Sequence, residues 1–129
     1  MLGELIFEGE GRFVYYKILR NGKMEDTEEY KGNFLGEKSI LTITAEGEIE
    51  PDGTGCFEFC GSWSTDGGSR TLLTGVGNIT IDPNGPNSWR GAFCINKQTG
   101  KFAKLSGVAI VFEGEWDENF LRIKAWEWK

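Results

Sequence analysis

The sequence predicts an all-β fold, a single antiparallel up-and-down β-barrel of about eight or nine strands that occupies residues 1–129 as one domain. Apolar and polar side chains alternate along most of the chain, and helical periodicity is nearly absent. That alternation is typical of strands with one buried face. The chain also has 19 glycines among 129 residues, an excess that suits many turns and bent strands. A two-sheet β-sandwich is the alternative fold.

Nine runs of alternating residues can be read as strands, each bounded by glycine, asparagine or aspartate. Almost every connection between them is short, so sequence neighbours should also be neighbours in the sheet. An open sheet of this kind has two unpaired edges, and closure into a barrel removes both. The expected strands cover residues 5–8, 13–19, 25–30, 40–49, 56–64, 71–81, 88–96, 108–116 and 120–128.

The connections carry turn-forming residues. Asn21 and Gly22 predict a two-residue hairpin of type I′, because both residue types tolerate positive φ. Segments 51–53, 66–68 and 82–85 contain Asp and Gly in the order that turns prefer, and segment 117–119 links the last two expected strands. These turns support the up-and-down order.

Alternation assigns the large aromatic side chains to the inside of the barrel. Eight of them form a candidate ligand-binding wall: Tyr16, Phe57, Phe59, Trp63, Trp89, Phe93, Phe112 and Trp116. An interior of about eight strands is either just filled by side chains or holds one small ligand, so these rings are either plain core or the lining of a cavity. Glycines on neighbouring positions relieve crowding in the first case and leave space in the second.

The last expected strand places tryptophans on the outside. If Leu121, Ile123 and Ala125 point inward, the tryptophans point outward and form an apolar patch on the outer surface. Monomers usually avoid exposed rings of this kind. We therefore predict a homo-oligomer interface there; the alternative is a register slip that makes the rings core. The predicted interface residues are Ala109, Val111, Phe120, Trp126 and Trp128.

Charge and composition exclude several classes. The net charge of −6 disfavours nucleic acid and anionic membranes as partners. No stretch is apolar enough to span a bilayer, and the first residues lack the features of a signal peptide, so a soluble cytoplasmic protein is expected. The chain has no histidine, which excludes a mixed Cys/His zinc site and a Ser-His-Asp triad. We expect no metal site.

Two further features concern single side chains. Cys56, Cys60 and Cys94 contain no CxxC spacing, and we expect them to be small buried thiols, with a reactive cysteine as the alternative. Arg90 lies in the middle of an expected strand, where Glu58 or Glu113 on the polar face should pair with it.

The C-terminal part of the chain carries a resemblance. Residues 100–113, the end Trp126-Glu-Trp-Lys129, Trp89-Arg90-Gly91 and Thr74-Gly-Val-Gly77 resemble a family of small uncharacterised prokaryotic all-β proteins. The stretch from Thr99 to Gly107 is also similar to a segment of the allene oxide cyclase and dirigent barrels. That second resemblance implies an eight-stranded barrel, often dimeric or trimeric, with a lipophilic cavity and no cofactor. It assigns no catalytic residue here.

Three hypotheses for function follow. The first is a barrel that binds a small apolar ligand in an aromatic-lined cavity. The second is a cofactor-free cyclase or isomerase of the allene oxide cyclase type, and the third is an interaction protein with a filled barrel. The size of the interior discriminates them: an apolar cavity of about 300 Å³ or more favours the first, and a buried ionisable group in it favours the second.

Overall fold

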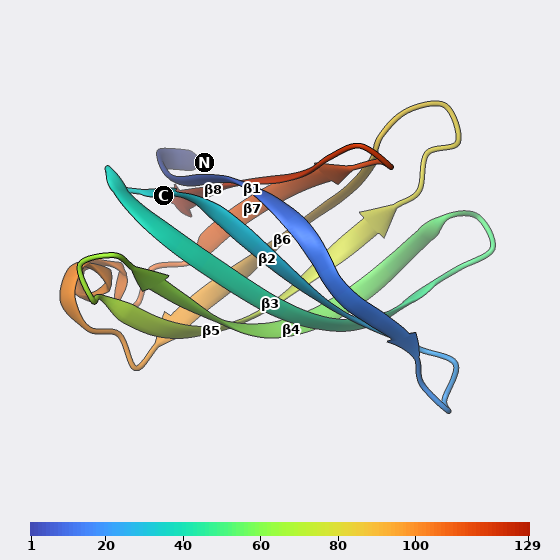
Figure 1. The fold of residues 1–129 in the computed structure, drawn as a ribbon. Helices are drawn as coiled ribbons and strands as arrows, with labels where there is room; N and C mark the ends of the chain where they lie inside the picture. Colours follow the sequence, from blue (N-terminus) through green and yellow to red (C-terminus); the bar gives the residue numbers. More distant parts are fainter.

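The computed structural model describes all 129 residues, and it is a closed antiparallel barrel of eight strands in up-and-down order (Figure 1). Each strand pairs with its sequence neighbours, and β1 also pairs with β8, which closes the sheet. The predicted barrel is confirmed, and the sandwich is excluded. The strands are β1 (Leu2–Ile18), β2 (Met24–Phe34), β3 (Glu37–Ile49), β4 (Thr54–Thr65), β5 (Arg70–Thr80), β6 (Asn87–Asn96), β7 (Ile110–Trp116) and β8 (Leu121–Trp128).

The first two expected strands form one long strand, β1, of 17 residues. We expected a break between segments 5–8 and 13–19, where Gly9 and Gly11 stand. The chain instead keeps its pairing with β2 through both glycines and shifts register only between Phe13 and Tyr15. A bulge of this kind bends a strand without ending it, so the strand count is eight rather than nine.

The tight hairpin turn lies at a different place from the one predicted. At the β1–β2 connection only Gly22 has positive φ (86°), and its N–H donates to the Leu19 carbonyl at 3.0 Å. A type I′ turn needs positive φ at both central residues, so the prediction for Asn21 and Gly22 was wrong. The pair Leu35 and Gly36, between β2 and β3, has that conformation, with φ of 50° and 84°.

One end of the barrel is filled and covered. Between β6 and β7 the chain forms a short 3₁₀ helix, η1 (Gly100–Leu105), which alternation did not predict. Its Phe102 and Leu105 are fully buried, and the ring of Phe102 stacks on Phe34 with centroids 4.5 Å apart. Trp63 packs against both rings, at 5.0 Å from Phe102 and 4.8 Å from Phe34. Figure 1 shows η1 at the end where β2 meets β3 and β4 meets β5.

The outer face carries most of the charge, as the alternation predicted. Arg90 pairs with Glu113 at 3.9 Å across β6 and β7, and both side chains are exposed. The three cysteines are exposed as well, so the expectation of buried thiols was wrong. Cys56, Glu58 and Cys60 are alternate residues of β4, so all three side chains point outward. No helix in the structure is both long and apolar enough to cross a membrane.

Candidate functional site: a cavity at the open end of the barrel

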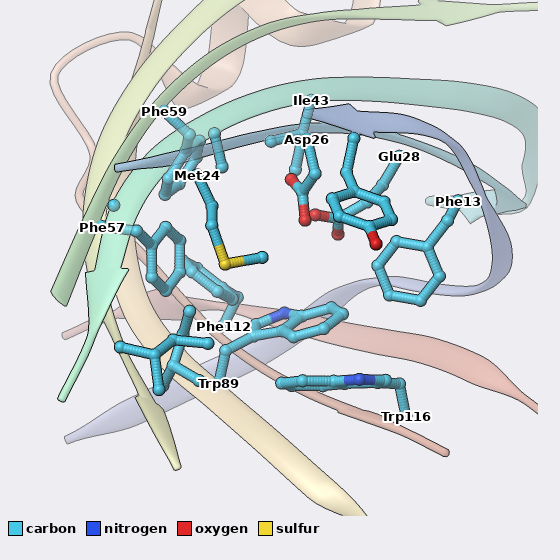
Figure 2. A pocket seen from close by; sticks show the side chains of 15 residues that line it. Phe13, Met24, Asp26, Glu28, Ile43, Phe57, Phe59, Trp89, Phe112 and Trp116 are labelled. Atoms are coloured by element: carbon cyan, nitrogen blue, oxygen red, sulfur yellow. The ribbon is translucent and has the colours of Figure 1, made fainter. Parts of the chain in front are cut away.

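The end of the barrel opposite η1 contains an open cavity of about 350 Å³. The ends of the strands that meet the β1–β2, β3–β4, β5–β6 and β7–β8 connections surround it, and Figure 2 shows side chains pointing into it from all sides. Twelve of its 15 lining residues are hydrophobic. The lining residues are Phe13, Tyr16, Met24, Asp26, Glu28, Ile43, Ala45, Gly47, Ile49, Phe57, Phe59, Ile79, Trp89, Phe112 and Trp116.

Most of the predicted aromatic wall surrounds this cavity. Six of the eight residues line it: Tyr16, Phe57, Phe59, Trp89, Phe112 and Trp116. Tyr16 stands at the rim, 66% exposed. Trp63 and Phe93 are buried in the core and do not line the cavity, and their rings contact each other at 6.3 Å. The structure therefore divides the predicted wall between a cavity and a core.

The aromatic walls are held by ring contacts on neighbouring strands. Trp89 of β6 and Trp116 of β7 stack with centroids 4.6 Å apart, and Figure 2 shows the two indoles lying one above the other. Phe112 contacts Phe59 edge-on at 5.4 Å. Aromatic pairs of this kind add to the energy of burial alone, so these contacts stabilise the wall.

Two interior glycines make room for these rings. A Cβ on Gly114 would overlap the indole of Trp89, and a Cβ on Gly77 would lie 2.7 Å from the ring of Phe57. Rings that cover glycines on an adjacent strand are a known way to stabilise a barrel wall. Here the glycines relieve crowding between strands, which was one of the two roles expected for them.

Strand β2 places two carboxyl groups on the inner face, beside the apolar wall. Asp26, Glu28 and Tyr30 are two residues apart, so all three side chains point into the barrel. Asp26 and Glu28 line the cavity, and Figure 2 shows their carboxyl groups close together. The fully buried Tyr30 donates its hydroxyl hydrogen to Glu28.

Sequence reasoning missed this cluster, because carboxylates on a strand are usually assigned to the solvent face. A signal was present. Tyr30 and Phe34 have the same phase as Asp26 and Glu28, and two large aromatic side chains mark the inner face of this strand.

Burial changes the acidity of all three groups. It raises the pKa of Glu28 well above its usual value, and the negative charge of Asp26 and a hydrogen bond with it raise that pKa further. Burial also raises the pKa of Asp26, although its hydrogen bond with Glu28 lowers it in part. The pKa of Tyr30 is raised well above its usual value by burial and by the charge of Glu28.

Oδ1 of Asp26 is buried and has no hydrogen-bond partner in the structure. Oε1 of Glu28 accepts the hydroxyl hydrogen of Tyr30. Two neighbouring buried carboxyls titrate in separate steps, because the charge of one disfavours the charge of the other. The pair can hold a proton, give it up or accept one next to an apolar cavity. No group of three His, Cys, Asp or Glu side chains is placed to hold a metal ion.

The predicted outer patch is divided as well. Trp126 is paired with Leu5 on β1 and with Val111 on β7. Val111 is paired in turn with Ala92, and Ala92 with Val76, so an apolar row crosses five strands on the outside. We call these five residues the outer apolar row.

The other predicted interface residues lie around this row. Trp128 is 54% exposed, and its N–H donates to the carbonyl of Ala109 at 2.9 Å, beside the row. Phe120 lies at the opposite end of β8, where the guanidinium of Arg122 covers its ring at 4.6 Å. The structure does not bring Phe120 together with the other predicted interface residues.

Comparison with known proteins identifies the fold. No family model matches this chain, and no curated protein matches it. A conserved protein of unknown function from Rhodopseudomonas palustris is similar in structure, with a TM-score of 0.72, 12% sequence identity, and coverage of 98% of this chain and 97% of the other. A protein of unknown function from Clostridium acetobutylicum has a TM-score of 0.74, 12% identity and 98% coverage of both chains. The barrel fold is thus shared with two bacterial proteins that are described as having unknown function.

Proposed function

We propose that this barrel binds a small, mainly apolar molecule in the cavity at its open end. One observation carries the proposal: the interior at this end is an aromatic-lined space of about 350 Å³ instead of packed core. Cavities of this size and lining are typical of small-molecule sites. A solidly filled barrel would favour an interaction protein, and only the end covered by η1 is filled in that way.

The walls have the chemistry that an apolar ligand needs. A molecule that buries about 200 Å² of apolar surface gains roughly 5 kcal/mol at 25 cal/mol per Å², before the entropy cost of binding. Aromatic rings from β1, β4, β6 and β7 supply this surface, and their contacts with each other hold them in place. A ligand would therefore meet a largely preformed site.

The test starts from protein purified from its host. Native mass spectrometry should detect a co-purifying small molecule bound to the barrel, and it counts subunits in the same measurement. An Ala45→Phe variant, which adds a ring inside the cavity, should lose that molecule. A matched Thr74→Phe variant adds the same ring on the exposed outer face of β5 and should keep it. Retention of the molecule by the Ala45→Phe variant would place its site elsewhere and defeat the proposal.

The second candidate is a cofactor-free isomerase or cyclase, which the pair of Asp26 and Glu28 favours. A positioned carboxyl with a raised pKa can move protons near neutral pH. A reaction of this kind breaks a C–H bond of the ligand, gives the proton to the pair, and returns a proton to another atom of the same molecule.

Isotope exchange tests this candidate. The co-purified ligand, incubated with the protein in D₂O, should incorporate deuterium at carbon. Glu28→Gln removes the proton of the pair and should stop the incorporation while the ligand stays bound. Equal incorporation with wild type and Glu28→Gln protein would remove proton transfer by this pair from consideration.

A further inference from the structure

The cavity holds negative charge that no protein cation balances. Asp26 and Glu28 both line it, and none of its other lining residues is lysine or arginine. Every ion pair in the structure involves other carboxylates, such as the pair of Lys17 and Glu25 on the outer face of β1 and β2. A buried charge is normally paired, so the missing partner is a feature of the site.

Of the two carboxyls, Asp26 is the one that is more accessible from the cavity. Glu28 is 7% exposed and accepts a hydrogen bond from Tyr30, so it is the better protected carboxyl. Asp26 is only half-buried, and its neighbours across the sheet are Tyr16 on β1 and Ala45 on β3. Neither neighbour supplies a positive charge. A ligand in the cavity is the remaining source of one.

The aromatic walls favour the same kind of ligand. Trp89 and Trp116 stack beside the space that the carboxyls line, and Figure 2 shows them across that space from Asp26 and Glu28. Aromatic faces attract organic cations, and tryptophan does so most strongly. Carboxyls on one side and aromatic rings on the other therefore complement an ammonium group on an apolar body.

We propose that the ligand of this cavity is an amine, whose ammonium group pairs with Asp26 while its apolar, preferably aromatic, body lies against Trp89 and Trp116. The inference rests on the proposed function, because it names the chemical class of the molecule that the cavity takes. The net charge of −6 adds a long-range attraction for cations.

Three probes of similar shape test the charge preference: 2-phenylethylamine, 2-phenylethanol and phenylacetate. NMR titration of the wild-type protein at neutral pH should give a dissociation constant for the amine at least tenfold lower than for the alcohol, a difference of about 1.4 kcal/mol. Phenylacetate should bind most weakly, because its carboxylate meets the charge of Asp26.

Substitution then assigns the preference to one side chain. Asp26→Asn should bring the dissociation constants of the amine and the alcohol to within a factor of about two. Glu58→Gln is the matched control, since it removes the same charge from an exposed outer position on β4 and should keep the preference.

A measurement on the wild-type protein alone covers the case in which Asp26→Asn does not fold. An ammonium favours the ionised carboxyl pair, so amine binding releases a proton, and the amine's affinity should rise as the pH rises through the raised pKa of the pair while the alkylamine stays protonated. The alcohol should show no such rise. Tyr16 and Tyr30 are the other titratable side chains that face the pair.

The outcomes separate this inference from the proposed function. If the alcohol binds as tightly as the amine, or the amine's affinity does not rise with pH, the amine inference is overturned and apolar binding stands. If none of the three probes binds at millimolar concentration and no molecule co-purifies, both fail together.

Discussion

The two ends of this barrel are built from the same alternation and differ in what fills them. At the end covered by η1, Trp63 contacts Phe7, Phe34 and Phe102, and all four side chains are almost completely buried. At the other end Trp89 and Trp116 stack with each other and leave about 350 Å³ in front of them. The two ends therefore differ in their cover as well as in their packing, because η1 closes only one of them.

The buried polar side chains also differ between the filled end and the hollow end. In the filled half, the indole of Trp63 donates to the hydroxyl of Ser39 at 3.2 Å, and this pair has no charge. In the hollow half, burial raises the pKa of both Asp26 and Glu28. The neutral polar pair therefore lies at the packed end of the barrel, and the buried ionisable groups lie at the open end.

The largest expected effect contrasts one ring from each end. Trp63→Ala should lower the free energy of unfolding by about 3–5 kcal/mol, because the buried ring leaves a void among three other rings. Phe57→Ala should cost roughly 1–2 kcal/mol, because the half-buried ring already borders open space. Urea denaturation of both variants measures the difference, and equal losses would mean that the cavity end is as tightly packed as the other.

The next effect concerns the support of the cavity wall. Gly114→Ala should cost about 1–3 kcal/mol and shift the fluorescence of Trp89, because the added Cβ displaces its indole. Gly85→Ala, in a turn where the nearest side chain is 3.4 Å away, should change stability by less than about 0.5 kcal/mol. A neutral result at Gly114 would show that the indole can move without cost.

The pH dependence of the free energy of unfolding should reveal the buried carboxyl Glu28 in the hollow half of the barrel. The pKa of Glu28 is higher in the folded protein than its usual value of 4.5, so the unfolded chain releases its proton at lower pH. The corresponding stability is present below about pH 4.5 and is lost as the pH rises through the folded pKa, by about 1.4 kcal/mol for each unit of difference. Glu28→Gln should flatten this decline in thermal unfolding, whereas Glu58→Gln should leave it unchanged.

The smallest effect on stability is expected for substitutions on the outer surface of the barrel. We propose that the outer apolar row, with Trp128 beside it, is an interface between two copies of the chain. Trp128→Lys and Val76→Lys together should change the free energy of unfolding by less than about 0.5 kcal/mol and yield a monomer by light scattering, since both residues are exposed.

Ile18→Lys, at an exposed position at the end of β1 and outside this row, is the control and should keep the oligomer. A wild-type protein that is already monomeric at high concentration would contradict the interface.

The alternation was enough to predict the barrel and which aromatic rings point inward. It was not enough to separate cavity from core, because that difference depends on η1, whose Phe102 lies in a segment without strand periodicity. The carboxyl pair was missed because Glu28 is an exception to the rule that charged residues face water. The turn at Asn21 and Gly22 has the residues of a two-residue hairpin, yet a third residue enters the loop.

The η1 helix also limits access to the cavity to one end of the barrel. Because Phe102 and Leu105 close one end of the barrel, a ligand of the proposed site would enter and leave through the same opening. A ligand longer than the cavity would therefore keep its far end in solvent.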